Sequence, residues 1–352
     1  MPRIVILGSG VMGSSIAVPV SEKGHEVLLG GSPLDDKIIA SLESSERCHP
    51  KIGVAMTPTV STVTDSALNA DHFKTDDIIL IGVSSAGIPW ALERICALAT
   101  NPSLVMMITK GLNTDSSGTV RTLPPLIEEK LAAAGFSDVP VVGVGGPCIA
   151  KELAEGQPTA GIFASREPQP AITAKGLFER PYYKITLSDD ILGVEACAAL
   201  KNLLTIAIAY TWTKYPAKNP TSTKPHDMNP AAAWFQQAVD EMAVLSELLG
   251  GRASTAYGLA GLGDLFVTVN AGRNSRMGQA LGQGMTVAHA FAGPLQDETV
   301  EGVDTGRELA GSIASALAEG SLDGARIPLT LEMIKTLSND DELQFDINNF
   351  YC

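Results

Sequence analysis

The chain has 352 residues, of which 45% are apolar and 18% charged, and its formal net charge is -14 at pH 7. This length is typical of two domains, and this composition is that of a folded globular protein. The negative charge argues against nucleic acid and anionic membrane surfaces as partners, so an anionic substrate would need a local cationic site.

The cysteines and the apolar runs indicate in which cellular compartment the protein is expected. The sequence has five widely spaced cysteines without a C-x-x-C pair: Cys48, Cys96, Cys148, Cys197 and Cys352. Such spacing suits reduced thiols, so we expect a cytoplasmic protein with no metal site. No signal peptide is expected, because the apolar start leads directly into a glycine-rich loop. The longest apolar run, Leu203–Trp212, is too short to span a bilayer, and no membrane insertion is expected.

The first motif is that glycine-rich loop. A strand precedes it at Arg3–Leu7, and a helix and a second strand follow it at Ser14–Lys23 and Glu26–Leu29. The loop has the pattern G-x-G-x-x-G of dinucleotide-binding sites, and its residues are Gly8, Ser9, Gly10, Val11, Met12 and Gly13. We interpret its three glycines, in order, as a tight turn, a close approach to the pyrophosphate, and a close contact of helix with strand. The helix start would offer amides to the phosphates.

The residues after the second strand bear on the cofactor. An acidic residue there favours NAD and a basic one favours NADP. Ser32 is neutral and fits either, so the prediction is NAD or NADP. Asp35 and Asp36 follow, and they either bind a ribose hydroxyl or cap the next helix; the sequence leaves both open.

Further apolar runs predict a parallel sheet that is covered on both faces. The expected strands are Asp77–Val83, Leu104–Thr109, Pro140–Gly145, Ala160–Ala164 and Tyr183–Leu187, and the expected helices between them include Gly87–Ala99 and Leu123–Ala134. Lys110 follows one of these strands, and Ala150 lies where the loop after another opens a helix. Ligands bind at this carboxyl edge, which suits Lys110 for a phosphate or nicotinamide contact, although a loop lysine is commonly just solvated.

The second half is organised around a helix predicted over Asp189–Trp212. Lys201 and Asn202 lie inside it among small apolar residues. Burying an ammonium group is costly unless an anionic or polar partner meets it, and burial lowers a lysine pKa toward the range useful for proton transfer. The alternative is that the stem packs while the ammonium group reaches water. The helix sequence alone leaves both open.

The remaining segments of the second half read as helices and loops. Lys214–Pro230 is predicted to be a surface loop, and the predicted helices are Ala231–Leu249, Thr305–Glu319 and the tail from Ile327. Residues 258–284 read as glycine-dense loops that bring backbone close to a ligand, with Arg273 and Asn274 suited to grip a phosphate.

From Ile4 to about Gly320 the chain resembles the NAD(P)-dependent glycerol-3-phosphate dehydrogenases, and most nearly their archaeal form. The resemblance rests on GSGVMGSSIA, ITKGL, GGPCIAKELAEGQPT, ALKNLLTIAIA, GLAGLGDL, GRNSRMGQALGQG and VEGVDT. It implies an α/β N-terminal Rossmann-like doubly wound domain over residues 1–188 and an all-α C-terminal domain over residues 189–352. It also implies a homodimer of glycerophospholipid metabolism that interconverts sn-glycerol 3-phosphate and dihydroxyacetone phosphate by hydride transfer with NAD or NADP.

The resemblance assigns roles to single residues. Lys201 matches the general acid/base that exchanges a proton with the C2 oxygen. The implied catalytic residues are Lys201, Lys110, Asp264 and Thr268. The implied substrate-binding residues are Lys110, Asn202, Arg273 and Asn274. The implied cofactor-binding residues are Gly8, Ser9, Gly10, Val11, Met12, Gly13, Ser32, Lys110, Ala150, Arg273 and Glu301.

The chain also departs from this family. Met12 stands where many bacterial members have Trp, Cys148 where Ser is common, and Ser32 where Arg is frequent; the Lys214–Pro230 loop is longer than usual. Two alternatives follow. One is a dehydrogenase of the same fold that acts on another phosphorylated or phosphonylated 2-hydroxy compound. The other is a non-catalytic NAD(P) sensor, which would be expected to have lost the Lys201 proton-transfer group.

Overall fold

The computed structural model describes residues 2–115, 118–218, 226–345 and 347–349. The chain forms two compact units, the first from residues 1–110 and 123–191 and the second from residues 111–122 and 192–352. The boundary predicted at 188/189 takes no account of the segment Gly111–Thr122, which belongs to the second unit. Of the predicted Lys214–Pro230 loop, residues 219–225 lie outside the described residues.

A mainly parallel sheet forms the centre of the first unit. Within the described residues its strand order is β10-β9-β8-β5-β4-β1-β2-β3. The strands are β1 (Ile4–Leu7), β2 (Val27–Gly30), β3 (Val60–Val63), β4 (Ile78–Ile81), β5 (Leu104–Met107), β8 (Val141–Gly145), β9 (Thr159–Ala164) and β10 (Tyr183–Ser188). The residues of β1, β2, β4, β5 and β8 are all buried, because helices cover both faces.

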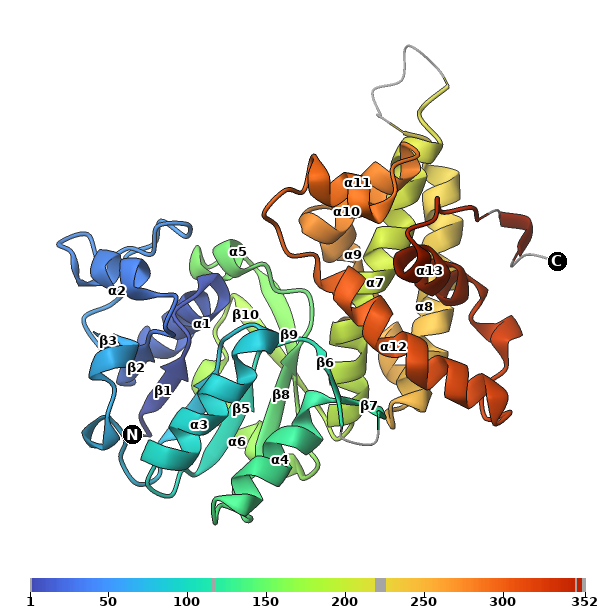
Figure 1. The fold of residues 1–352 in the computed structure, drawn as a ribbon. Coiled ribbons are helices and arrows are strands. Elements are labelled where there is room, and N and C mark those ends of the chain that lie inside the picture. The colour runs from blue at the N-terminus through green and yellow to red at the C-terminus, as the bar shows by residue number, and fades with distance from the viewer. Residues whose placement is uncertain (1, 116–117, 219–225, 346, 350–352) are drawn as a thin grey trace. The chain divides into compact units, whose positions relative to one another are not determined.

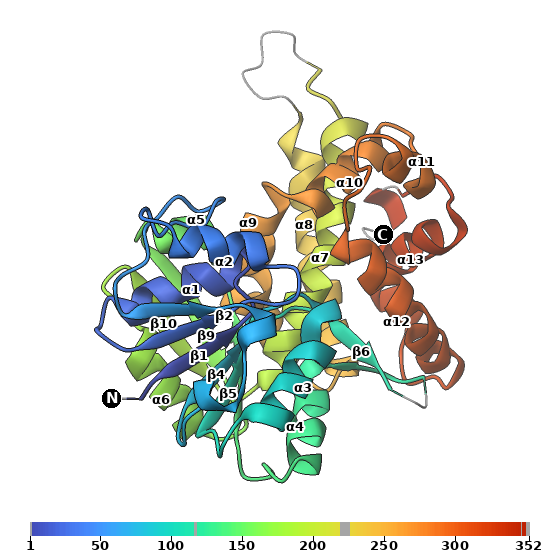
Figure 2. The ribbon, with the colours of Figure 1, turned by 60° about the vertical axis from the view of Figure 1, so that its left-hand side comes forward.

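Helices flank this sheet in the doubly wound manner. They are α1 (Val11–Ser21), α2 (Asp36–Glu43), α3 (Ile88–Leu98), α4 (Leu123–Ala133), α5 (Ala150–Ala154) and α6 (Pro168–Phe178). Helix α1 packs against α5 and α6, whereas α3 packs against α4 on the opposite face (Figures 1 and 2). The chain moves from β1 to β2 on one side and later to β4 on the other, so the strand order reverses at β1. This reversal is where doubly wound sheets bind ligands.

One strand pairing departs from the predicted parallel order. Strands β8 and β9 run antiparallel, with Val144 opposite Phe163, whereas the other neighbouring pairs of this sheet are parallel. A parallel return requires a crossover, usually a full helix. The chain between these strands holds only the five-residue helix α5, and β9 accordingly returns beside β8 in the opposite direction.

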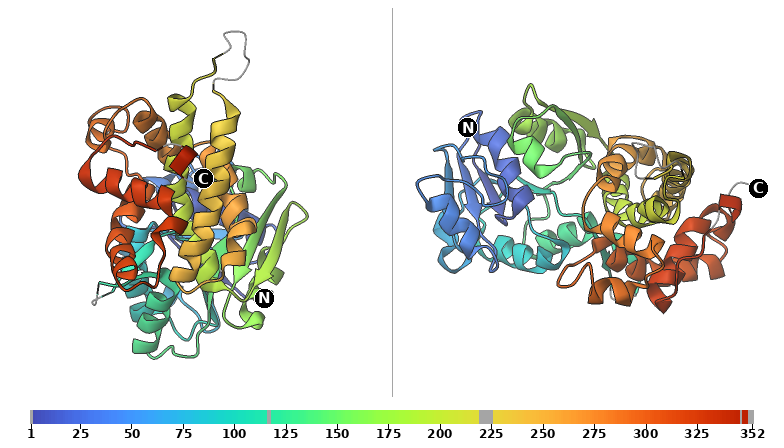
Figure 3. Two further views of the ribbon diagram at one scale, coloured as in Figure 1. Left: turned by 90° about the vertical axis from the view of Figure 1, so that its right-hand side faces the viewer. Right: turned by 90° about the horizontal axis from the view of Figure 1, so that it is seen from above.

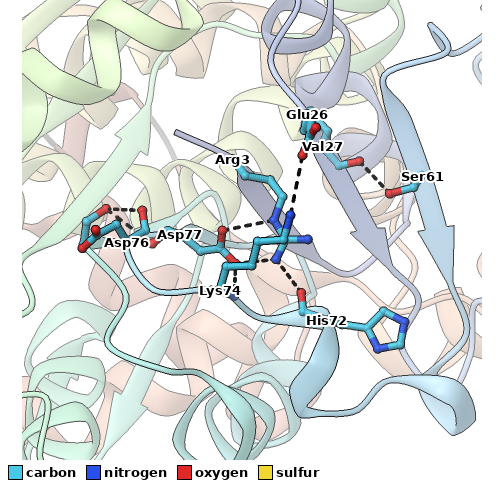
Figure 4. A network of polar contacts seen from close by, with 9 residues as sticks. Arg3, Glu26, Val27, Ser61, His72, Lys74, Asp76 and Asp77 are labelled. Atoms are coloured by element: carbon cyan, nitrogen blue, oxygen red, sulfur yellow. Dashed lines mark hydrogen bonds and ion pairs between the residues drawn. The ribbon is translucent and has the colours of Figure 1, made fainter. Parts of the chain in front are cut away.

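A partly buried ion pair joins the amino ends of β1 and β4 (Figure 4). The guanidinium group of Arg3 donates to both carboxylate oxygens of Asp77, at 3.1 and 2.6 Å, and to the carbonyl oxygen of His72. The amide of Lys74 also donates to Asp77, at 2.8 Å. Because the Asp77 side chain is only 3% exposed, these donors replace the water that its charge loses on folding.

The described residues of the second unit form mainly helices, together with a small hairpin. Its helices are α7 (Ile191–Lys214), α8 (Met228–Leu248), α9 (Asp264–Val269), α10 (Arg273–Gly282), α11 (Val287–Ala292), α12 (Glu301–Ala318) and α13 (Pro328–Asn339). Helices α7 and α8 lie side by side (Figure 3), with the rings of Tyr210 and Trp234 stacked at 5.4 Å. The hairpin of β6 (Leu112–Thr114) and β7 (Val120–Thr122) packs on α12, where the amide of Val120 donates to Ser312 at 3.0 Å.

Helix α7 is the core of this unit. Among the described residues it is the helix that is long and apolar enough to cross a membrane, yet 94% of its most apolar window is buried inside the protein. Because α7 is buried on all sides, it has no amphipathic stripe, as expected for a helix that is surrounded by other helices.

Three predictions for the second unit are wrong in detail. Residues 258–284 are mainly helical rather than loops, because their glycines serve close helix packing. A methyl group at Gly278 would lie 2.2 Å from the Ile206 carbonyl oxygen of α7, and one at Gly282 would lie 2.3 Å from that of Tyr210. Helix α12 begins at Glu301 rather than at Thr305. The predicted helical tail ends at Asn339, where Asp340 adopts a left-handed φ of 58°.

Candidate active site

The glycine loop of the first unit joins β1 to α1, and its three glycines meet different surroundings. Gly8 has a φ of +107°, and a methyl group there would lie 2.7 Å from Val83. A methyl group at Gly13 would lie 2.1 Å from the carbonyl oxygen of Gly8. At Gly10 it would meet nothing within 4 Å. The protein's own packing therefore requires the first and third glycines, whereas the second leaves space open to a ligand.

A cavity of about 360 Å³ lies beside this loop. Its lining comes from the segments that follow β1, β2 and β4 and from the start of α3, and it includes Gly8, Gly10, Ser32, Asp35 and Trp90. Of the other predicted cofactor residues, Ser9 and Gly13 are buried, while Val11 and Met12 are partly buried in the first turn of α1. Lys110 and Ala150 belong to the same unit, past the ends of β5 and β8, but are not part of this lining.

Asp35 has a role that the sequence left open. It precedes α2 at the capping position, yet its side chain makes no capping hydrogen bond. Its Oδ2 instead accepts from the amides of Ser9, at 3.1 Å, and Ser32, at 2.9 Å. Gly31 makes room for this fold-back, because a methyl group there would lie 2.8 Å from Ile39 and 3.3 Å from Asp35. The capping interpretation is therefore wrong for Asp35, which joins the glycine loop to the end of β2.

The second unit buries Lys201. The residue is 5% exposed, and its Nζ forms a hydrogen-bonded ion pair with Oδ1 of Asp264, which is 2% exposed. The interpretation in which the Lys201 ammonium group reaches water is therefore wrong. Asp264 begins α9 directly after a short π-helix, η5 (Leu259–Gly263). This turn needs glycine, since a methyl group at Gly261 would lie 2.1 Å from the carbonyl oxygen of Ala256.

A chain of amide hydrogen bonds runs beside this pair and joins α7, α10 and α12. Asn202 donates to Glu301 at 3.0 Å and accepts from the side chain of Asn274 at 2.9 Å. The side-chain oxygen of Asn274 accepts from the amide of Gly302, at 2.9 Å. Each amide group thus has one defined orientation. Gly302 permits the approach of α12, because a methyl group there would lie 2.4 Å from the Asn202 carbonyl oxygen.

Arg273 and Thr268 complete the predicted set. Arg273 begins α10, its side chain is 45% exposed, and its guanidinium group donates to Thr299 at 2.6 Å and lies 3.6 Å from Glu301. Thr268 donates its hydroxyl proton to the backbone carbonyl of Asp264 at 2.6 Å, so it supports α9 from within.

The predicted site residues are therefore divided between the two units. The second unit gathers Lys201, Asn202, Asp264, Thr268, Arg273, Asn274 and Glu301, and the first unit holds the glycine loop, Ser32, Lys110 and Ala150. Sequence reasoning missed Trp90, which lines the cavity and donates its indole proton to Asp65 at 3.0 Å, and Thr299, the partner of Arg273. Neither belongs to a motif that could have revealed it. Among the described residues, no group of three or more His, Cys, Asp or Glu side chains is placed to hold a metal ion.

Two protein-family models match this chain, one over each of its two parts. Residues 3–171 match the model of the NAD-dependent glycerol-3-phosphate dehydrogenase N-terminus, and residues 190–345 match that of the C-terminus. The NADP(+)-dependent glycerol-3-phosphate dehydrogenase of Archaeoglobus fulgidus is 34% identical over 82% of each chain. The glycerol-3-phosphate dehydrogenase [NAD(P)+] of Acidobacterium capsulatum is 32% identical over 95% of this chain and 93% of its own.

Solved structures share the fold. The glycerol-3-phosphate dehydrogenase of Coxiella burnetii has a TM-score of 0.74 at 24% identity, covering 99% of this chain and 98% of its own. That of Plasmodium falciparum has a TM-score of 0.81 at 18% identity, covering 100% of this chain and 95% of its own. With the family models matched over both parts and a relative above 30% identity, the chain belongs to the NAD-dependent glycerol-3-phosphate dehydrogenase family.

Proposed function

We propose that this protein interconverts sn-glycerol 3-phosphate and dihydroxyacetone phosphate by hydride transfer with NAD or NADP. The observation that carries the proposal is the buried Lys201–Asp264 pair beside the amide chain of Asn202 and Asn274. The named activity of the relatives and the ligand-sized cavity at the glycine loop support it. When bound, the nicotinamide ring supplies or accepts the hydride.

Lys201 is the proposed general acid and base. In its neutral form it takes the C2 hydroxyl proton as the alcohol is oxidised, and in its ammonium form it returns that proton to the C2 oxygen as the ketone is reduced. Asp264 stabilises the ammonium form and fixes the position of Nζ. Thr268 holds the backbone of Asp264 and acts on Lys201 through it. Lys110 is proposed as a second lysine that takes part in this proton transfer.

Arg273, Asn202 and Asn274 are the proposed phosphate ligands, together with Lys110. An arginine offers a planar fork of donors that matches phosphate oxygens. In the present structure Glu301 and Thr299 hold that fork, so a bound phosphate would exchange the long 3.6 Å contact of Arg273 with Glu301 for shorter bonds to its own oxygens. The proposed cofactor residues are those of the glycine loop with Ser32, Lys110, Ala150, Arg273 and Glu301.

The test is the initial rate of NADH and of NADPH oxidation with dihydroxyacetone phosphate, followed at the nicotinamide absorbance. Turnover with either nucleotide supports the proposal. If both nucleotides bind but neither is oxidised, the assigned substrate is wrong, and other phosphorylated or phosphonylated 2-oxo compounds are the next ones to assay.

We also propose a homodimer that works in the cytoplasm in glycerophospholipid metabolism. Among the described residues, no disulfide joins Cys48, Cys96, Cys148 or Cys197, which suits a reducing compartment. Light scattering on the eluting peak of a gel-filtration column measures the mass in solution, and a value equal to one 36.8 kDa chain would contradict the dimer.

A further inference from the structure

The carboxylate of Asp35 lies beside the glycine loop, and its two oxygens differ in their hydrogen bonds. Oδ2 accepts from two backbone amides, those of Ser9 and Ser32. Within the described residues, Oδ1 accepts no hydrogen bond, although the residue is only 8% exposed. Asp35 also lines the cavity at the ends of β1 and β2. A carboxylate that two backbone amides hold in place thus lies at the wall of the cavity with one oxygen left to accept from a ligand.

The surroundings of this carboxylate are short of positive charge. Among the described residues that line the cavity there is no lysine or arginine. His49 lies near Asp35, but burial and then Lys51 lower the pKa of its imidazole, while Asp35 opposes them. A lowered pKa makes the imidazole of His49 a weaker source of positive charge beside Asp35 than an ordinary histidine.

The two nicotinamide cofactors differ at a single group, the ribose 2′ position, which carries a hydroxyl in NAD and a phosphate in NADP. In doubly wound folds an acidic residue after the second strand accepts a hydrogen bond from that hydroxyl, and an arginine accommodates the phosphate. A dianionic phosphate beside the charge of Asp35 would be repelled, and no lysine or arginine among the described residues of the cavity lining would compensate.

We infer that Asp35 makes this protein selective for NAD(H) over NADP(H), with Oδ1 as the acceptor of a ribose hydroxyl. The inference rests on the proposed function, because it assumes that the cavity binds a nicotinamide dinucleotide. It sets this chain apart from the similar enzyme of Archaeoglobus fulgidus, whose name gives NADP(+) as its cofactor.

Direct binding tests the inference without catalysis. Isothermal titration of the full-length protein with NADH and with NADPH gives two dissociation constants, and NADH is expected to bind at least about tenfold more tightly. Asp35→Asn keeps an oxygen acceptor for the amides but removes the charge, so the ratio of the two constants should move toward one. Asp36→Asn removes the same charge from the exposed neighbouring residue, and its ratio should stay that of the wild type.

A second variant covers the case in which Asp35→Asn loosens the loop, which its melting temperature would reveal. Ser32→Arg leaves the Asp35 carboxylate in place and adds a cation at the cavity, so it should tighten NADPH binding more than NADH binding. Equal or tighter wild-type binding of NADPH, or an unchanged ratio in a folded Asp35→Asn variant, overturns the inference and leaves the proposed function standing. If neither nucleotide binds the wild type, the proposed function fails as well.

Discussion

Replacing glycine by alanine should have different consequences at two positions of the glycine loop. Gly13→Ala should destabilise the first unit, whereas Gly10→Ala should leave stability nearly unchanged and weaken dinucleotide binding. The two sites share a loop and a helix, so a difference between them reports the local contacts and not the general effect of adding a methyl group.

The magnitudes follow from the contacts of the added carbon. At Gly13 it would lie 2.1 Å from the Gly8 carbonyl oxygen, so backbone must move by roughly 1 Å, and we expect a net loss of at least about 2 kcal/mol after the helix-propensity gain of about 1 kcal/mol. At Gly10 the φ of -59° and ψ of 178° suit alanine, and no atom lies within 4 Å. The change there should stay within about 1 kcal/mol.

Thermal unfolding and nucleotide titration check both halves of this prediction. For a unit of this size each kcal/mol moves the melting temperature by about 2–4 °C, so Gly13→Ala should melt several degrees below the wild type. Gly10→Ala should melt with the wild type and bind NADH at least about tenfold more weakly, because its methyl group occupies the space for the pyrophosphate. A stable Gly13→Ala protein, or unchanged NADH binding by Gly10→Ala, would refute the reasoning.

Three further predictions concern the ion pairs and buried polar groups. Asp77→Asn should lower the free energy of unfolding by about 2–3 kcal/mol in denaturant titrations, whereas Glu26→Gln, which touches only an exposed 3.9 Å pair, should cost less than about 0.5 kcal/mol; equal losses would contradict this. Burial raises the pKa of the Glu241 carboxyl group in the folded protein, although four donors hydrogen-bond to it. The stability that this group contributes is therefore fully present below the ordinary carboxyl pKa, and it is lost as pH rises through the raised pKa of the folded state. The wild-type melting temperature should therefore fall relative to that of Glu241→Gln across this window, and parallel profiles would refute the assignment. Asn274→Asp replaces the amide that donates to Asn202 with a charge, and in steady-state kinetics it should raise the KM for dihydroxyacetone phosphate about tenfold or more, whereas an unchanged KM would exclude Asn274 from the phosphate site.

The main elements could be predicted because their burial shows in composition. Strands such as Ile78–Ile81 are continuous apolar runs, and the helix around Lys201 is apolar on every side, so a charge inside it is conspicuous. Strand β3 was missed because it is a four-residue edge strand with polar Ser61 and Thr62 at its centre. The short helices α2 and α6 were missed for a similar reason, since little of either is apolar and continuous.

Other features depend on contacts that a linear pattern does not contain. Glycine favours loops, yet Gly278 and Gly282 lie within a helix because α10 passes close to the backbone of α7. An aspartate before a helix predicts a cap, yet the side chain of Asp35 turns to the glycine loop because Gly31 leaves room for it. In both cases the reason is a partner far away in the sequence.

Removal of the Lys201 ammonium group tests the central claim most directly. Lys201→Met keeps an apolar side chain of similar length in place of the buried stem but removes the ion pair with Asp264. Breaking a buried ion pair in this way lowers the free energy of unfolding by about 3–5 kcal/mol. The double variant Lys201→Met with Asp264→Asn removes that charge and serves as the folded control, with its fold checked by melting temperature and NADH titration.

The measurement is the turnover of NADH with dihydroxyacetone phosphate by the wild type and by these two variants at equal nucleotide saturation. The account predicts that both variants bind NADH as the wild type does and lose about 10²–10⁴-fold in kcat, the usual share of general acid/base catalysis. A folded, NADH-binding variant that turns over at the wild-type rate would contradict the assignment of Lys201 as the proton-transfer group.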